Sequence, residues 1–231
     1  MKRLIIIPAY NEGENIKKTV DNIIESAPNF DYIVINDCST DNTAQICKEN
    51  HFNYIDLPIN LGIGGAVQTG YRYAYEKGYD MVVQVDGDGQ HDAKFLDIMA
   101  ETMEKEKADM IIGSRFIDKQ GFQSSRTRRM GIFYFTWLIK LISHKTITDP
   151  TSGLRMIGKD VIKMFAYNYP KDYPEPETAV TILRSGKKIV EIPVIMRQRQ
   201  GGISSINMKN SIYYMIKVSL AIVIESIRSW H

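Results

Sequence analysis

Residues 82–91 read VVQVDGDGQH, and this stretch sets how the rest of the chain is interpreted. The apolar run that opens it is typical of a strand buried on both faces of a sheet. Residues i and i+2 of a strand share a face, so Asp86 and Asp88 point the same way at its carboxyl end. Two such carboxylates repel each other unless a cation lies between them, and a hard divalent ion is the natural occupant. An acidic, glycine-rich turn without a ligand is the competing interpretation.

Strand and helix patterns alternate on both sides of this stretch. Apolar runs typical of buried strands occur at residues 4–7, 32–35, 54–57, 81–85 and 110–113, with helical patterns between them. This alternation predicts an α/β fold with a mostly parallel sheet and right-handed crossovers. After Arg115 the pattern changes to a polar, basic segment at 117–130, predicted to be a mobile loop, and then an aromatic-rich helix at 130–142. Shorter elements follow: strands at 154–157, 189–192 and 194–196, and helices at 159–165 and 177–185.

Polar and glycine-rich segments also follow the first three predicted strands. They are PAYNE at 8–12, NDCSTD at 36–41 and NLGIGGA at 60–66. Parallel strands bring their carboxyl ends to one edge of the sheet, which is where such sheets bind ligands. Carboxylates there can accept hydrogen bonds from a ribose, an aromatic ring can stack on a base, and glycines at a helix start favour anions. Each segment alone is typical of a cap or turn, but together with the D-x-D pair they favour a nucleotide-diphosphate site.

Composition excludes several other classes of protein. The formal net charge of +2 does not favour nucleic acid as a partner. Cys38 and Cys47 are predicted to be free thiols in a reducing compartment. The chain starts directly with an apolar strand pattern, which predicts a cytoplasmic protein without a signal peptide. It contains neither a P-loop motif nor a G-x-G-x-x-G after the first strand.

Successive motifs over residues 3–206 resemble those of family 2 glycosyltransferases. Five motifs carry the general resemblance: PAYNEGENI (8–16), INDCSTDNT (35–43), NLGIGGAVQTGYRYA (60–74), QVDGDGQHD (84–92) and GSRF (113–116). Three more resemble the polyprenyl-phosphate (dolichol-phosphate) sugar synthase group: DGDGQH (86–91), DPTSGLRMIGKDVI (149–162) and EIPVIMRQRQGGISSI (191–206). The resemblance implies a GT-A fold, a Rossmann-like, mostly parallel sheet flanked by helices. It places a nucleotide-sugar and metal half at 1–116, an acceptor half at 117–206 and a C-terminal apolar helix at 207–231.

Roles for individual residues follow from the same resemblance. It implies that Asp88, with Asp86 and Gln90, binds Mg²⁺ or Mn²⁺, and that Arg115 and Arg199 face phosphates. The residues it assigns to the nucleotide sugar are Pro8, Tyr10, Glu12, Asp37, Gly65 and Asp86. Two departures from the family pattern stand out. Asn36 and Cys38 replace an Asp and a Gly of the second motif, and Ser205 stands where related synthases often have Lys, which removes a cation from the acceptor side.

The predicted activity is inverting transfer of a sugar from a nucleotide-diphosphate sugar to a polyprenyl phosphate. A UDP-sugar is favoured as donor, and GDP-mannose is also compatible. Asp88, Arg115, Glu177 and Arg199 are the predicted catalytic residues. A sugar hydroxyl on a growing glycan is the alternative acceptor, and it needs a general base, for which Glu177 or Glu175 is placed. The competing hypothesis from another class is a non-catalytic nucleotide-sugar-binding partner.

The C-terminal residues 211–226 are apolar nearly all round, with Lys217 and Glu225 as exceptions. The segment is shorter than the roughly 20 apolar residues that a membrane span needs. A core helix and an interfacial membrane helix fit it equally well. The second interpretation predicts peripheral attachment to the inner face of the cell membrane. A homo-oligomer or a small membrane partner is left open.

Overall fold

The computed structural model describes residues 1–121, 126–171, 174–196 and 208–227. Within them a seven-stranded sheet has the order β3-β2-β1-β4-β6-β5-β7. Strand β6 is antiparallel to both of its neighbours, whereas the other pairs are parallel, so the predicted α/β fold with a mostly parallel sheet is confirmed. The strands are β1 (Arg3–Ala9), β2 (Asp31–Asn36), β3 (Tyr54–Asp56), β4 (Met81–Gln84), β5 (Met110–Ser114), β6 (Arg155–Gly158) and β7 (Ile189–Pro193).

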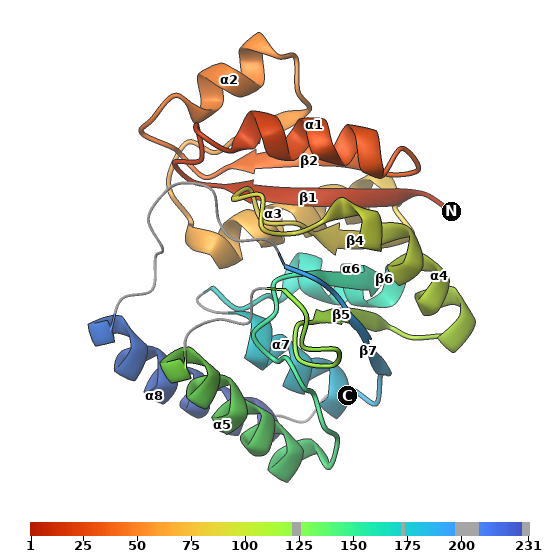
Figure 1. Ribbon diagram of the computed structural model, residues 1–231, viewed down its shortest axis with the longest axis vertical. Helices are drawn as coiled ribbons and strands as arrows, with labels where there is room; N and C mark the ends of the chain where they lie inside the picture. The colour runs from red at the N-terminus through yellow and green to blue at the C-terminus, as the bar shows by residue number, and fades with distance from the viewer. Residues whose placement is uncertain (122–125, 172–173, 197–207, 228–231) are drawn as a thin grey trace.

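Helices cover both faces of the sheet (Figure 1). In β1, Leu4 and Ile6 join one buried cluster while Ile5 and Ile7 join the other, as the two-residue period of a strand requires. Helices α1 and α4 lie over one face, and α3, α6 and α7 over the other. The helices are α1 (Ile16–Ser26), α2 (Thr43–Glu49), α3 (Gly62–Lys77), α4 (Leu96–Glu106), α5 (Arg126–Ser143), α6 (Lys159–Tyr167), α7 (Pro174–Arg184) and α8 (Met208–Ile227), with a 3₁₀ turn η1 (Ala93–Phe95) before α4.

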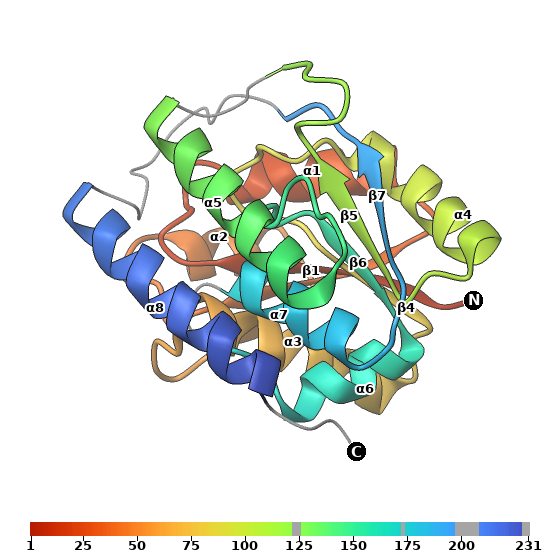
Figure 2. The same cartoon turned by 90° about the horizontal axis from the view of Figure 1, so that it is seen from below.

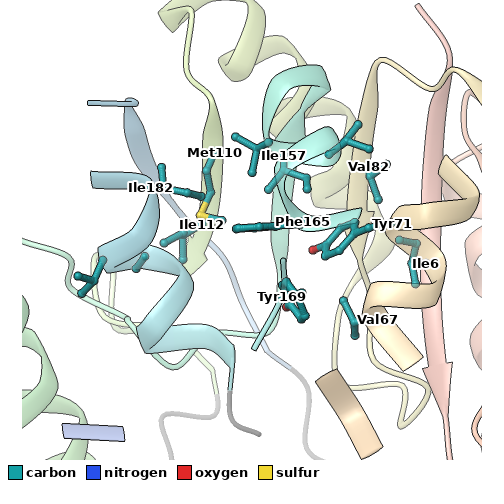
Figure 3. Close-up of a cluster of buried hydrophobic side chains, with 14 of the residues drawn as sticks. Ile6, Val67, Tyr71, Val82, Met110, Ile112, Ile157, Phe165, Tyr169 and Ile182 are labelled. Atoms are coloured by element: carbon teal, nitrogen blue, oxygen red, sulfur yellow. The ribbon is translucent and has the colours of Figure 1, made fainter. Parts of the chain in front are cut away.

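Aromatic rings fill the cluster under α3 and α6 (Figure 3). The rings of Tyr71, Phe165 and Tyr169 contact one another with centroids 5.1–5.6 Å apart. Two of the pairs are edge-on and one is tilted, and aromatic pairs of this kind stabilise a core beyond the area that they bury. They fix α3, which begins with the glycine-rich segment, against α6 and the chain that leads to α7.

Two element boundaries differ from the sequence prediction. Helix α5 begins at Arg126, so the predicted loop 117–130 is wrong for residues 126–130, and residues 122–125 lie outside the described part. Arginine and methionine are good helix formers, which explains why the helix extends back into the basic segment. Helix α7 begins at Pro174 rather than at Glu177, because proline is well tolerated in the first turn of a helix. Residues 194–196 form only an isolated bridge between Met196 and Gly121.

The C-terminal helix α8 packs on α5 and α7 (Figure 2). Val218 and Ile222 are buried in the same cluster as the aromatic rings above, so the inward face of α8 belongs to the core. The Tyr134 and Ser219 hydroxyls, 3.0 Å apart, join α5 to α8. None of the described helices is both long and apolar enough to cross a membrane.

Candidate active site

The D-x-D segment lies against the loop that follows β1. Strands β1 and β4 are parallel neighbours, so their carboxyl ends lie side by side. A Cβ atom placed on Gly87, between the two aspartates, would be 3.1 Å from the Pro8 carbonyl oxygen and 3.5 Å from Glu12 Cγ. The sheet therefore brings Pro8 and Glu12 next to the aspartate pair, as the strand pattern predicts.

Asp37 ties together the loops after β1, β2 and β3. It is buried, and its backbone N–H donates to the Ala9 carbonyl at 2.9 Å. Its Oδ1 accepts a hydrogen bond from the Leu61 N–H at 2.7 Å, while Oδ2 has no hydrogen-bond partner within the described residues. Tyr10 is about half exposed at the same edge. One carboxylate oxygen and one aromatic ring are thus available there to a nucleoside.

Two hydrogen bonds hold Asp86, one at its carboxylate and one at its backbone. Gln84 Nε2 donates to Asp86 Oδ1 at 3.0 Å. His91 Nδ1 accepts from the Asp86 backbone N–H at 3.1 Å, so a neutral His91 carries its proton on Nε2. That buried Nε2 lies 3.9 Å from Asp86 Oδ2 and lacks a hydrogen-bond partner within the described residues. A Cβ on Gly153 would be 2.8 Å from the same Oδ2, so only glycine leaves room for this carboxylate.

Asp88 and Gln90 complete the part of the site that could hold a metal. Asp88 is partly exposed, and its Oδ1 accepts from the Gln90 backbone N–H at 3.0 Å. No cluster of three His, Cys, Asp or Glu side chains suited to a metal occurs among residues 1–121, 126–171, 174–196 and 208–227. Two carboxylates and an amide fit Mg²⁺ or Mn²⁺ when water and substrate phosphates supply the other ligands, which is the usual arrangement for Mg²⁺.

Arg115 forms an ion pair inside the protein. It is buried, and its Nε and Nη2 each lie 2.6 Å from an oxygen of Asp149, with Nη2 also 3.0 Å from Thr151 Oγ1. The predicted contact of Arg115 with a phosphate stays a prediction. The residue forms an internal ion pair that joins the end of β5 to the loop before β6. Its partner is 34 residues away, and the motif GSRF gave no sign of it.

One glycine at the start of α3 is required for packing. The Gly64 N–H donates to the Lys171 carbonyl at 3.1 Å, and a Cβ on Gly64 would collide with the carbonyls of Pro170 and Lys171. Gly64 therefore accommodates another segment of the chain rather than a phosphate. Gly65 is partly exposed, and its predicted contact with the nucleotide sugar stays a prediction.

Two glutamates lie in the first turn of α7. Burial raises the pKa of Glu175 above its usual value, with a smaller contribution from the Asp86 charge, while Arg155 and Arg128 oppose the shift. Glu175 is thus electrostatically linked to Asp86 of the D-x-D pair. Glu177, the predicted base, is partly exposed on the same turn. The predicted phosphate ligand Arg199 lies outside the residues that the structure describes.

Arg155 is a residue to which the sequence assigned no role. Its buried guanidinium donates to the carbonyls of Ser152 and Pro150, both at 2.7 Å, and to Thr178 Oγ1 at 2.9 Å. These bonds join the DPTSG loop to the first turns of α7. They fix the positions of Gly153 beside Asp86 and of Glu175. The only sequence signal for this role of Arg155 was the motif DPTSGLR, in which small and polar residues precede an arginine in a buried strand.

Residues 4–165 match the model of the family described as Glycosyl transferase family 2. The chain belongs to this family. The resemblance inferred from its motifs is therefore confirmed, and the protein is a glycosyltransferase by family. The D-x-D edge described above is its candidate active site.

Relatives of this family 2 glycosyltransferase cover most of its length. An undecaprenyl-phosphate mannosyltransferase of Micrococcus luteus is 29% identical over 221 residues, covering 90% of this chain and 88% of that protein. A UDP-N-acetylglucosamine–dolichyl-phosphate N-acetylglucosaminyltransferase of Methanococcus voltae is 32% identical over 211 residues, covering 82% and 83%.

Solved structures share the fold at low sequence identity. Glucosyl-3-phosphoglycerate synthase of Mycobacterium tuberculosis has a TM-score of 0.76 at 14% identity, covering 99% of this chain and 81% of that one. A mannosyltransferase of Pyrobaculum calidifontis, solved with GDP-Man and Mn²⁺, has a TM-score of 0.68 at 17% identity, covering 100% and 65%. These likenesses confirm the GT-A architecture.

Proposed function

We propose that this glycosyltransferase moves a sugar from a nucleotide-diphosphate sugar to a polyprenyl phosphate at a membrane surface, with inversion at the anomeric carbon. The observation that carries the proposal is the meeting of the Asp37 loop, the Pro8–Glu12 loop and the D-x-D pair at one edge of the sheet. The relatives from Micrococcus and Methanococcus, named for transfer to undecaprenyl and dolichyl phosphate, support the choice of acceptor.

The nucleoside is held by the loops after β1 and β2. Asp37 Oδ2 accepts a hydrogen bond from the nucleoside, and Tyr10 stacks on the base. Pro8 and Glu12 form the wall toward the D-x-D segment, and the backbone at Gly65 lies on the diphosphate side. A UDP-sugar or GDP-mannose is compatible with these groups. Structural neighbours solved with UDP, Mn²⁺ and phosphoglyceric acid, or with GDP-Man and Mn²⁺, support this donor class.

Asp88, Asp86 and Gln90 are the residues that hold a divalent ion. When bound, Mg²⁺ or Mn²⁺ neutralises the charge that develops on the departing nucleotide diphosphate. The protein contributes pre-organisation, because Gln84 bonds the Asp86 carboxylate, His91 bonds the Asp86 backbone N–H, and Gly153 leaves room for the carboxylate.

The acceptor side contains cations and one unusual carboxyl group. A phosphate acceptor is already ionised, so it needs positioning by cations such as Arg128, Arg129 and Arg199 but no general base. One observation favours the second candidate, a glycan hydroxyl acceptor. The raised pKa of Glu175 suits a general base, and its ionisation responds to Asp86 inside the site. Glu177 on the same turn is the other candidate base.

Substitution of Asp88 tests the proposed function. Asp88→Asn is expected to abolish Mn²⁺-dependent binding of a nucleotide sugar, measured by calorimetry, and transfer to undecaprenyl phosphate in detergent. Asp21→Asn, on the exposed face of α1, is the matched control and is expected to leave both unchanged. Equal metal-dependent donor binding by Asp88→Asn and wild type would rule out the metal assignment.

Separate glutamine variants of the two glutamates distinguish the acceptors. With a phosphate acceptor, Glu175→Gln and Glu177→Gln retain most of the transfer rate. With a hydroxyl acceptor, one of them loses roughly 100-fold or more, the usual contribution of general-base catalysis. The rates are compared using undecaprenyl phosphate and an oligosaccharide as alternative acceptors.

A further inference from the structure

His91 is a buried side chain that uses only one of its two ring nitrogens. The side chain is 1% exposed, and its Nδ1 accepts a hydrogen bond from the Asp86 backbone N–H at 3.1 Å. The proton of the neutral ring is therefore on Nε2, which has no hydrogen-bond partner in the part of the chain that the structure describes. Buried donors without a partner are rare in folded proteins, so this one calls for a physical reason.

The unused nitrogen lies close to the carboxylate of Asp86. The distance from His91 Nε2 to Asp86 Oδ2 is 3.9 Å. A hydrogen bond from nitrogen to oxygen needs about 3.2 Å or less. The torsion that turns an aspartate carboxylate is broad, so a small rotation closes the gap. Hydrogen bonds in an active site are often long in the free protein and shorten when the ligand binds. Oδ2 of Asp86 thus has a donor within reach.

The other oxygen of Asp86 already has a buried donor. Gln84 Nε2 donates to Asp86 Oδ1 at 3.0 Å, and Gln84 is itself buried. Each carboxylate oxygen has two lone pairs, so it can accept one hydrogen bond from the protein and still bind a ligand. A donor on Oδ1 alone leaves the carboxylate free to turn about its axis, whereas a second donor on Oδ2 stops that rotation. On the side of Gly153 the space is narrow, because a Cβ there would be 2.8 Å from Oδ2.

The backbone of the D-x-D turn is fixed by other hydrogen bonds. The Val85 N–H donates to the Ile6 carbonyl at 3.0 Å. Thr19 Oγ1 donates to the Gly87 carbonyl at 3.1 Å. The residues on both sides of Asp86 are therefore attached to β1 and α1 without help from the histidine, and Nδ1 adds a bond to Asp86 itself. The fold of the turn does not need the Nε2 proton, which leaves the carboxylate as its target.

From these contacts we infer that His91 is a positioning residue for Asp86. Its Nε2–H donates to Asp86 Oδ2 when the site is loaded and, together with Gln84 on Oδ1, fixes the orientation of the carboxylate toward the divalent ion and the nucleotide diphosphate. The imidazole is too deeply buried to touch either ligand, so it acts through Asp86. Hydrogen bonds to the carboxylates of a metal site orient these ligands and raise metal affinity. The inference rests on the proposed function, because it takes Asp86 as part of the donor and metal site.

Two variants of similar shape separate the two nitrogens of His91. The amide of asparagine reaches about as far as Nδ1, and the amide of glutamine about as far as Nε2. His91→Asn can therefore still accept from the Asp86 N–H but has no donor near Oδ2. His91→Gln keeps a donor near Oδ2 and loses the acceptor for the backbone.

Calorimetry with UDP and with GDP, each with and without Mg²⁺, measures the effect on binding, and thermal unfolding measures the effect on the fold. Wild type is expected to bind one of the two nucleotides in a Mg²⁺-dependent manner. His91→Asn is expected to melt near wild type but to bind that nucleotide in Mg²⁺ roughly 10-fold or more weakly, as is usual when a partner of a metal ligand is removed. His91→Gln is expected to bind more tightly than His91→Asn and to melt lower. A purely structural role of the histidine predicts that His91→Asn binds like wild type.

Nitrogen NMR of the His91 ring gives a second test that uses wild type only, so it stands if a variant does not fold. Without metal and nucleotide the proton is expected on Nε2. Mg²⁺ with bound nucleotide is expected to move the Nε2 proton downfield, because the bond to Asp86 shortens. A proton on Nδ1 in the free protein overturns the inference.

The calorimetry also distinguishes failure of the inference from failure of the proposed function. If wild type and His91→Asn bind the nucleotide equally in Mg²⁺, the inference is wrong and the proposed function is unaffected. If wild type binds neither nucleotide in Mg²⁺, the proposed function is contradicted and the inference with it.

Discussion

The buried ion pair of Arg115 and Asp149 gives the sharpest test of how the site is built. Both side chains are almost completely excluded from solvent, and two guanidinium nitrogens lie 2.6 Å from the two carboxylate oxygens. Asp149→Ala leaves the guanidinium buried without its counter-charge. Removing one partner of a buried pair typically costs about 3–5 kcal/mol. That is a large part of the roughly 5–15 kcal/mol that separates native from unfolded protein.

The same loss of free energy can be expressed as a decrease in melting temperature. In a chain of this size each kcal/mol shifts the melting temperature by about 2–4 °C. Asp149→Ala is therefore expected to melt roughly 6–20 °C below wild type, and Arg115→Ala should be similarly destabilised. The double variant Arg115→Met with Asp149→Leu removes both charges and fills the space with apolar groups. It should recover most of the loss, because such replacements are often neutral or stabilising.

Two measurements distinguish the roles proposed for Arg115, ion pairing with Asp149 and phosphate binding. They are thermal unfolding followed by circular dichroism, and donor binding. If it acts through the ion pair, the double variant melts near wild type and still binds nucleotide sugar. The reasoning fails if Arg115→Ala keeps the wild-type melting temperature but loses transfer. That outcome would support the role in phosphate binding suggested by the sequence.

Three further substitutions address the nucleotide, the metal and the acceptor side. Asp37→Ala should weaken nucleotide diphosphate and nucleotide sugar equally, by about 1.5–3 kcal/mol for a charged hydrogen bond; calorimetry showing loss of the nucleotide sugar alone would contradict the nucleoside role. Gly153→Ala puts a Cβ 2.8 Å from Asp86 Oδ2, so Mn²⁺-dependent donor binding should fall, and unchanged Mn²⁺ affinity would count against a fixed Asp86. Burial raises the pKa of Glu175 above 4.5 in the folded protein. Between the pKa of the unfolded chain and that of the folded protein, the unfolded chain binds fewer protons at this residue, so stability declines as pH rises through this range. Glu175→Gln removes that decline and should melt higher than wild type at pH 7, whereas identical pH profiles would refute the shift.

The sequence by itself determined the fold class and the position of the site. Strands buried on both faces need continuous apolar runs, so residues 4–7 and 81–85 could be identified without a structure. Parallel strands carry their C-terminal loops to one edge, which predicted that Asp37 and the D-x-D pair lie at a common site. The motif resemblance then gave the family, because several short motifs in a fixed order rarely coincide by chance.

Only the tertiary structure decided which side chains meet across long stretches of chain. Apolar periodicity indicates whether a residue is buried, but not which residues it packs against. The sequence therefore could not show that Arg115 is neutralised by Asp149, or that Gly64 packs on Lys171. The C-terminal helix illustrates the same limit. Its pattern fitted a core helix and a membrane helix equally, and the packing of α8 beside α5 showed that one side is core and the other exposed. Such pairings depend on the space left between distant segments after the whole chain has folded, and no local pattern encodes that space.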